Sequence, residues 1–448
     1  MTSVLDSVLI QNNFSTPEIR HIWSDDNKIA KQLLVEANLA KIQGQLGIIP
    51  ASAAKNIIEQ AQVEKFDFQA LQTESAQKRH SLIALIHTLQ TLVGGQDGEY
   101  VHFGVTTQDI VDTGIMLQTK EAYEVICSHT NRLIKVVADL TKKHRCTLMM
   151  GRTHGIHAIP ITFGFKLAIW LDELLRSQRR LEQLLENEVF VGSISGAVGT
   201  YAAFDGRGSE IERAVLKELG LATPTISWQP SRDRFSEFAT VLGICSATLG
   251  KIGHELFNLM RTEINEIQEP FKKGEVGSST MPQKRNPALI EGLASLTQPV
   301  FSSVSLMLQS MLIDGERDAI HWRNEWVALP EITSYLDAQI VNLTGILSDL
   351  TVNTDQMRHN LELQGKLSYS ERIMFEIGKK VGKQTAHKII YQAAMTALEE
   401  DKNFIELLVN DKRVSGYCSK SEISSWAVPE NNIGEALSKI DAVLAKVK

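Results

Sequence analysis

The chain has 448 residues, about three times the length of an ordinary domain, so it has room for two or three domains and a large core. Hydrophobic residues make up 43% and charged residues 22%, with a net charge of -7, and this balance lacks the basic surplus of a nucleic-acid-binding protein. The four cysteines form no C-x-x-C pair, and neither a leader-like start nor an apolar run of about 18 residues is present. These features argue against a disulfide framework and predict a soluble, cytoplasmic protein that binds no membrane.

Helix start signals appear early in the chain. Thr16 followed by Pro17 combines a capping residue with a proline at the first helical position, which predicts a short helix. Ser24 precedes two aspartates and predicts a second helix, which we expect to end near Gly47.

The rest of the chain favours long helices. Only 11 prolines occur, and the stretches between them are long. Leucines recur at helical spacing from Leu167 to Leu185, with charged residues between them, which indicates one amphipathic helix. Alternating strand patterns are hard to find, so the sequence predicts an all-α protein. Similar runs occupy residues 108–142, 232–267, 287–314 and 329–350.

The helical runs suggest three domains. We predict an N-terminal helical domain at 1–110, a central long-helix bundle at 111–350 and a C-terminal helical domain at 351–448. A helix of 30 residues is about 45 Å long, and an apolar stripe of that length needs a partner, which we expect to be another copy of the chain. The alternative, a monomeric helical solenoid, would require an internal repeat, and we find none.

The most unusual segment is KGEVGSSTMPQKRNP at 273–287. Its glycines and paired serines predict a mobile loop, and its polar end leads into an apolar helix that starts near Leu289. Polar side chains at a helix start are typical of anion sites. A solvated linker would explain the glycines and serines but not the Met-Pro pair followed by polar, hydrogen-bonding side chains.

GSSTMPQKRNP at 277–287 resembles the signature GSSxMPxKxNP of the fumarase/aspartase superfamily. Two further segments occur in that superfamily's order, VHFGVTTQDIVDT at 101–113 and MMGRTHGIHAIPITFGFKLA at 149–168. The resemblance implies an all-α, three-domain fumarase/aspartase-like fold with a central long-helix bundle. It also implies a homotetramer whose active sites are each shared by three subunits, and chemistry that needs no metal or organic cofactor.

The resemblance further implies a reaction mechanism. A general base removes a proton next to a substrate carboxylate, a dianion forms, and the neighbouring C–N or C–O bond breaks, with release of fumarate in most members. Ser278 falls at the position of the base, and a serine acts so only in a closed site that stabilises its alkoxide. Lys284 and Asn286 fall where the dianion is stabilised.

Other motif positions suggest residues that bind the substrate or donate a proton. Thr106 and Thr107 match carboxylate-binding positions, although Thr107 alone is equally well explained as a helix cap. A lone histidine is more often structural than catalytic, but His154 matches the superfamily's catalytic histidine and Glu291 the carboxylate that orients it. By the same resemblance, we expect further substrate contacts at Thr153, Gln229 and Arg317.

Two branches of the superfamily are similar to different parts of the chain. KRHSLIALI, with His80 as a catalytic position, and SISGAVGTYA resemble adenylosuccinate lyase, whereas WRNEWVALPEI resembles 3-carboxy-cis,cis-muconate cycloisomerase. The residues that bind the nucleotide phosphate in the first branch are replaced here by Trp322, Arg323 and Trp326. The structural alternative for the two tryptophans is core packing.

We therefore expect a lyase that eliminates fumarate from an N-succinyl (aspartyl) adduct, with a small-molecule substrate that bears a succinyl or polycarboxylate group and is not the nucleotide. The alternatives are a cycloisomerase that lactonises a tricarboxylate and a helical scaffold that has lost its chemistry.

Overall fold

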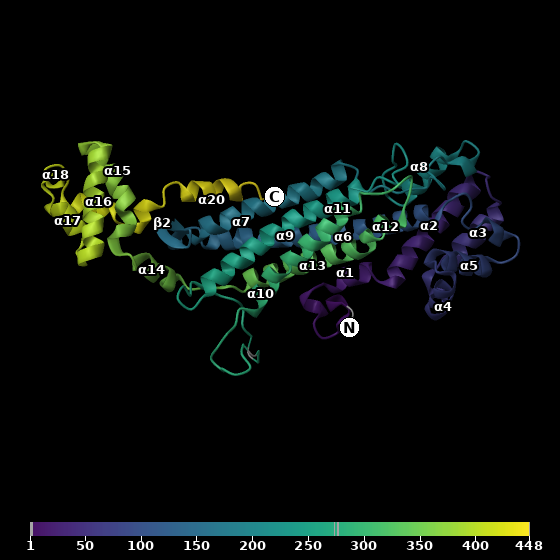
Figure 1. Ribbon diagram of the computed structural model, residues 1–448, viewed down its shortest axis with the longest axis horizontal. Coiled ribbons are helices and arrows are strands. Elements are labelled where there is room, and N and C mark those ends of the chain that lie inside the picture. The colour runs from purple at the N-terminus through teal and green to yellow at the C-terminus, as the bar shows by residue number, and fades with distance from the viewer. Residues whose placement is uncertain (1–2, 273, 276, 448) are drawn as a thin grey trace. The chain divides into compact units, whose positions relative to one another are not determined.

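The computed structural model describes residues 3–272, 274–275 and 277–447 (Figure 1). Lys273 and Val276, which belong to the predicted loop, lie outside the described residues. The chain forms two compact units. The first contains Met1–Asn131, Ser177–Gly250 and Gly292–Asn342, and the second contains Arg132–Arg176, Lys251–Glu291 and Leu343–Lys448. The predicted division at 110 and 350 stays a prediction.

Both predicted N-terminal helix starts are confirmed. The Thr16 hydroxyl accepts the backbone N–H of Ile19 at 3.4 Å at the start of α1, and the Ser24 hydroxyl accepts that of Asn27 at 3.2 Å at the start of α2. The chain leaves α2 through Gly47, whose φ is +68°. The helices here are α1 Pro17–Ile22, α2 Asp25–Gln45, α3 Ala51–Gln60, α4 Phe68–Lys78 and α5 Ser81–Val93.

Long helices follow, as the sequence predicted. The longest is α6, with 37 residues, and buried apolar residues recur along it at helical spacing. The all-α class is confirmed by these helices, which Figure 1 labels. Their bounds are α6 Thr107–Lys143, α7 Phe163–Glu186, α9 Asp233–Met260 and α13 Asn324–Ser348.

Three helix boundaries differ from the prediction. α9 ends at Met260 because the chain turns at Asn265, whose φ is +48°, and then enters a strand. The run at 287–314 forms two helices, α10 Ala288–Ser295 and α11 Thr297–Gln309. α13 begins at Asn324 and contains Pro330 in its second turn, where the proline leaves the helix without one intrahelical hydrogen bond.

The segment between α6 and α7 is a β-hairpin that the sequence analysis missed. Strands β1 Leu148–Thr153 and β2 Ile156–Thr162 pair antiparallel, with an irregularity between Met150 and Arg152. His154 and Gly155 form the two-residue turn with φ of +53° and +79°, and positive φ at both positions is typical of a hairpin turn. Histidine is an uncommon choice for such a position, so the turn signal was weak.

The remaining elements complete the two units. In the second unit, β3 Ile267–Gln268 pairs with β4 Thr351–Val352. Farther along, α15, α16, α17 and α19 enclose a separate apolar core that includes Ile373, Ile389 and Leu408, drawn in green to yellow in Figure 1. The other helices are α8 Gly208–Glu218, α12 Ala319–Trp322, α14 Thr354–Glu362, α15 Ser370–Val381, α16 Lys383–Glu400, α17 Phe404–Asn410, α18 Lys412–Ser415, α19 Lys420–Trp426 and α20 Ala436–Leu444.

Candidate active site

In the first unit, predicted substrate-binding residues meet at the start of α6. An Arg317 guanidinium N–H donates to the Thr106 hydroxyl at 2.9 Å, and the Thr106 backbone N–H donates to the Asp109 carboxylate at 3.0 Å. The helix begins at Thr107, so Thr106, rather than Thr107, holds the capping position. An exposed guanidinium next to a helix N-terminus suits a carboxylate ligand.

The Asp109 side chain stabilises this helix start through buried hydrogen bonds. No role was predicted for Asp109 from the sequence. Its fully buried carboxylate accepts the backbone N–H groups of Ser195 and Gly196, at 3.0 and 2.9 Å, and the Ser193 hydroxyl at 3.0 Å. Burial raises the pKa of Asp109, while these hydrogen bonds favour its charged form. An acidic residue three positions after Thr106 fits a helix-capping pattern, and this pattern could have indicated Asp109 from the sequence.

Gln229 belongs to the same network. Its side-chain N–H₂ donates to the Gly196 carbonyl at 3.0 Å and to the Asp109 carboxylate at 3.2 Å. The residue is 1% exposed, and its amide oxygen accepts no hydrogen bond from the described residues. Gln229 thus stabilises the loop that contains Gly196. Its predicted contact with substrate stays a prediction.

A buried ion network lies one helical turn further along α6. Arg232 donates to Asp112 at 2.8 Å and to Glu325 at 2.5 Å, and none of these three side chains reaches solvent. The Trp322 indole N–H donates to Asp112 at 2.8 Å, which holds α12 against α6 and fixes the chain that carries Arg317. Trp322 is therefore part of the core, as the core-packing alternative predicted.

Trp326 differs from Trp322 because it is 40% exposed. The two rings meet edge to face with centroids 5.1 Å apart, and the Arg323 guanidinium lies 5.9 Å from the Trp326 ring centre. The Lys28 ammonium lies 5.8 Å from the same ring centre, so one exposed tryptophan and two cations form this surface.

Two histidines of the first unit are held by different partners. His80 caps α5, because its Nδ1 accepts the Ile83 backbone N–H at 3.2 Å, which leaves the ring proton on Nε2 in the neutral form. His102 bonds the buried Glu36 carboxylate at 2.6 Å. Burial lowers the pKa of His102, but Glu36 outweighs it, and the net pKa is raised. His102 and Thr107 line one cavity of about 200 Å³.

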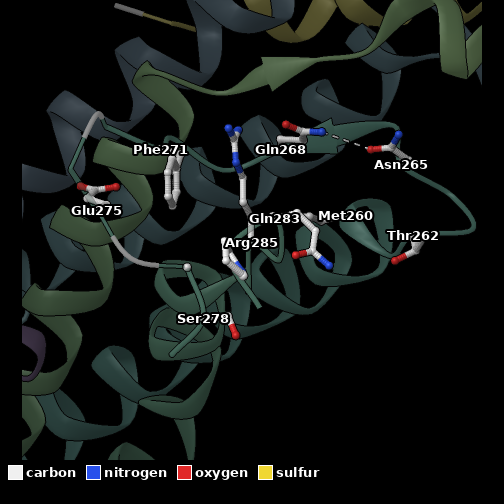
Figure 2. A pocket seen from close by; sticks show the side chains of 11 residues that line it. Met260, Thr262, Asn265, Gln268, Phe271, Glu275, Ser278, Gln283 and Arg285 are labelled. Carbon is white, nitrogen blue, oxygen red and sulfur yellow. Dashed lines mark hydrogen bonds between the residues drawn. The ribbon is translucent and has the colours of Figure 1, made fainter. Parts of the chain in front are cut away.

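In the second unit, the Ser278 hydroxyl oxygen accepts two backbone N–H groups, from Met281 at 3.1 Å and from Thr280 at 3.4 Å. Ser278 is half-buried and faces a cavity of about 860 Å³ (Figure 2). Two N–H donors on one oxygen favour an alkoxide over a hydroxyl, which is what a serine base requires.

The rest of this cavity wall combines polar and apolar side chains. Figure 2 shows the Asn265 and Gln268 amides, which form a hydrogen bond of 3.4 Å, and the Arg285 guanidinium beside the Phe271 ring. The guanidinium carbon lies 4.5 Å from the centre of that ring. Other lining residues are Met260, Thr262, Glu275, Gly277, Pro282 and Gln283.

Lys284, Asn286 and Glu291 line a second cavity, of about 920 Å³. It adjoins the Ser278 cavity, since four residues, including Arg285, line both. Glu291 is exposed on α10, whereas its neighbours Ile290 and Leu293 are fully buried. Amphipathicity of α10 therefore accounts for a glutamate in this apolar stretch.

The start of α10 is bound by the side chain of Glu269, a residue for which no role was predicted from the sequence. The Glu269 carboxylate accepts the backbone N–H groups of Ile290 at 3.0 Å and Leu289 at 3.4 Å. The sequence indicated an external anion at this helix start, and the protein's own carboxylate lies there instead.

Thr153 and His154 are exposed at the hairpin turn. The preceding residue, Arg152, is anchored by two hydrogen bonds to the buried Glu266, at 3.0 and 2.7 Å. Within the described part of one chain, no hydrogen bond or ion pair joins His154 to Glu291. The predicted pair therefore stays a prediction.

The described residues contain no group of three or more His, Cys, Asp or Glu side chains arranged to hold a metal ion. Nor does this part of the chain contain a helix long and apolar enough to cross a membrane. His154 lies at the turn of the β1–β2 hairpin and His157 on β2, so the two histidines do not share a helical face.

Comparison with known proteins defines the class. Residues 9–301 match the lyase family, and residues 366–443 match the adenylosuccinate lyase C-terminus. The chain belongs to this lyase family, within the fumarase/aspartase superfamily, and it is a lyase.

Individual relatives refine this picture. The chain is 52% identical to N-acetyl-S-(2-succino)cysteine lyase of Enterococcus italicus, over 99% of this chain and 97% of that protein. It is 37% identical to adenylosuccinate lyase of Methanocaldococcus jannaschii, over 98% and 96%. The 3-carboxy-cis,cis-muconate lactonizing enzyme of Pseudomonas putida has a TM-score of 0.91 and 31% identity, and the match covers 98% of this chain and 99% of that one.

Proposed function

We propose that this lyase eliminates fumarate from a 2-succinyl thioether, with N-acetyl-S-(2-succino)cysteine as the first substrate to test. The observation that carries the proposal is the 52% identity, over nearly the whole chain, with a relative named for that substrate, against 37% for adenylosuccinate lyase. The succinyl half agrees with the predicted adduct, and the leaving atom becomes sulfur instead of nitrogen.

The proposed reaction is a β-elimination. Ser278 removes a proton from the succinyl CH₂ group, which lies next to one carboxylate. The resulting electron pair forms the C=C bond, the C–S bond breaks, and its electrons leave with sulfur. The products are fumarate and the free thiol of N-acetylcysteine, so atoms and charge balance.

The contacts of Ser278 support its role as the base. A hydroxyl has a far higher pKa than the operating pH, so it acts only where the alkoxide is stabilised. The N–H groups of Met281 and Thr280 point at the Ser278 oxygen at 3.1 and 3.4 Å, which is the kind of support that an alkoxide needs.

The cationic groups support two separate carboxylate contacts. Arg317 and Thr106 offer a guanidinium and a hydroxyl in the first unit, and Lys284 and Asn286 offer an ammonium and an amide in the second. A dianion that develops at one carboxylate gains most from the group that faces it, and we assign that role to Lys284 and Asn286.

Elimination of a thiol from a thioether depends less on a general acid than elimination of an amine does. A cysteine thiol has a pKa of about 8.5, so the thiolate leaves with little help, whereas an amine nitrogen must be protonated to leave. We assign His154, oriented by Glu291, to deliver the proton to sulfur, with His80 as the second catalytic histidine.

A second candidate is the N-succinyl adduct expected from the sequence. The match of residues 366–443 to the adenylosuccinate lyase C-terminus favours it. Its leaving group would be an amine, so it predicts a stronger dependence on the acid.

One experiment separates the readings. The purified protein is incubated with N-acetyl-S-(2-succino)cysteine, adenylosuccinate or 3-carboxy-cis,cis-muconate, and fumarate, free thiol and diene absorbance are followed. We expect fumarate and thiol in equal amounts from the thioether, with at least a hundredfold lower kcat/KM for adenylosuccinate. Comparable turnover of adenylosuccinate would favour the second candidate. Loss of diene absorbance without fumarate would indicate a cycloisomerase, and inactivity on all three compounds would indicate a scaffold.

A further inference from the structure

Glu269 fills the first turn of α10 with its carboxylate. It is 8% exposed, and its oxygens accept the N–H groups of Ile290 and Leu289 at 3.0 and 3.4 Å. Burial raises the pKa of Glu269, the backbone N–H groups of this turn favour the charged form, and the negative charge of Glu291 opposes it. A carboxylate here complements the positive end of the helix.

The backbone that carries Glu269 is held independently of the signature loop. The two residues before it form β3, where Ile267 pairs with Val352 and Gln268 with Thr351. The next residue back, Glu266, is fully buried and bonds Arg152 at 2.7 Å and the Asn360 side-chain amide at 2.8 Å. Glu269 is therefore presented from a fixed support.

The loop, in contrast, is tied together at its two ends. The Asn286 N–H donates to the Gly277 carbonyl at 3.4 Å, so the start of α10 contacts the residue before Ser278. The approach is close, because a Cβ added at Gly277 would lie 2.5 Å from the Lys284 carbonyl oxygen. A displacement of the α10 start would therefore move Lys284, Asn286 and Ser278 together.

We propose that Glu269 is a positioning residue that locks the start of α10 and thereby sets Ser278, Lys284 and Asn286 for the reaction. The assignment of catalytic roles to these three residues rests on the proposed function. It follows that the backbone N–H groups of Leu289 and Ile290 do not bind the substrate carboxylate, because Glu269 already occupies them.

The first test is kinetic. Misplacement of reacting groups by about 1 Å costs roughly a hundredfold in rate, so we expect E269A to lower kcat/KM at least tenfold, mainly through kcat. E269Q keeps an acceptor oxygen in the same place and should lose less. Formate supplies the missing carboxylate, and we expect it to restore E269A at least threefold, while chloride at equal ionic strength does not.

The matched control is Asn403→Ala. Asn403 caps α17 by accepting the Glu406 N–H at 3.1 Å, and it belongs to the separate C-terminal core. Its removal takes away a helix cap without touching the loop, so kcat/KM should stay within twofold of the unmodified enzyme and formate should have no effect.

A second measurement needs no substrate. Hydrogen exchange at the amides of Leu289 and Ile290, followed by mass spectrometry, should accelerate in E269A and slow again when formate is added. Unchanged exchange in E269A, an E269A enzyme within twofold of native, or a loss that neither formate nor E269Q recovers would each overturn the proposal. An unmodified enzyme that is inactive on every adduct would instead overturn the proposed function, and the exchange measurement would still test Glu269.

Discussion

Ser278 and Lys284 belong to one loop but line different cavities, which suggests a division of tasks between proton removal and charge stabilisation. In the proposed mechanism, the N–H groups on the Ser278 oxygen stabilise the base itself, whereas Lys284 stabilises charge that builds up in the substrate. Substitutions at the two positions should therefore have different kinetic signatures.

Ser278→Ala should lower kcat by roughly 100- to 10,000-fold, because the base acts in the transition state, and should leave KM within about threefold. Single-turnover rates measure the chemical step directly. Ser279→Ala is the control, since it removes the adjacent, exposed hydroxyl. A Ser278→Ala enzyme within tenfold of native would mean that another group is the base, with His80 or His154 next in line.

Lys284→Met should behave differently, because in the proposed mechanism the ammonium contacts the substrate carboxylate before and during the reaction. We expect KM to rise and kcat to fall together, with kcat/KM lower by roughly 100-fold or more. Steady-state kinetics with the thioether measures both constants. A change in kcat alone would place Lys284 away from the ground-state carboxylate.

His154→Ala should make the rate depend more steeply on the leaving group. Without an acid, sulfur must leave as the thiolate, so kcat should fall as the pKa of the thiol rises across a series of succinyl thioethers. Glu291→Gln should steepen the same plot, and the double variant should add little, because we assign Glu291 a role that acts only through His154. Equal slopes in native and His154→Ala enzymes would exclude His154 as the acid.

Among the elements, α6 and α13 are joined by the guanidinium of Arg232, which faces one carboxylate on each helix. Arg232 neutralises only one of the charges of Asp112 and Glu325, so the network retains a buried negative charge when both acids are ionised. Burial and the nearby Asp112 outweigh the attraction of Arg232 and raise the pKa of Glu325 to about 7. Folding therefore favours the protonated form of Glu325.

The sign of the pH effect follows from this shift. In the unfolded chain Glu325 has its ordinary pKa, so between that value and about 7 the folded state binds more protons and stability falls as pH rises. Glu325→Gln carries no titrating proton and should flatten this fall, by at most about 1.4 kcal/mol per pH unit. Thermal unfolding midpoints at pH 5.5 and 8 measure it, with the exposed Glu218→Gln as control. Parallel pH profiles in native and Glu325→Gln proteins would contradict the shift.

For the whole molecule, exposed apolar side chains on the long helices support assembly. Ile244 on α9 is 42% exposed, Phe301 on α11 is 42% exposed, and Leu308, two turns later, is 50% exposed. Large apolar side chains that recur along helices in this way are typical of a face covered by another subunit.

We predict a homotetramer, with a mass near four times 49.8 kDa in light scattering at micromolar concentration. Phe301→Glu combined with Leu308→Glu should dissociate it, because two charges would be buried. Mixing inactive Ser278→Ala and Arg317→Ala chains after mild dissociation should restore activity above that of either parent if active sites are shared. A native mass near that of the monomer would refute the assembly.

Much of this protein was determined by local sequence. Helical periodicity, capping residues and the spacing of prolines act over a few turns, so the long helices and the starts at Thr16 and Ser24 followed from the chain alone. The superfamily signature likewise indicated Ser278, Lys284 and Asn286, and the structure places the last two in one cavity.

Only the tertiary structure decided which groups meet across long sequence distances. Asp109 bonds a loop more than 80 residues away, and Arg317 reaches Thr106 across 211 residues, contacts that no local pattern encodes. The α10 start illustrates the reason. Its sequence indicated a free anion site, but whether another carboxylate reaches it depends on where the chain folds back, and the fold brings Glu269 there.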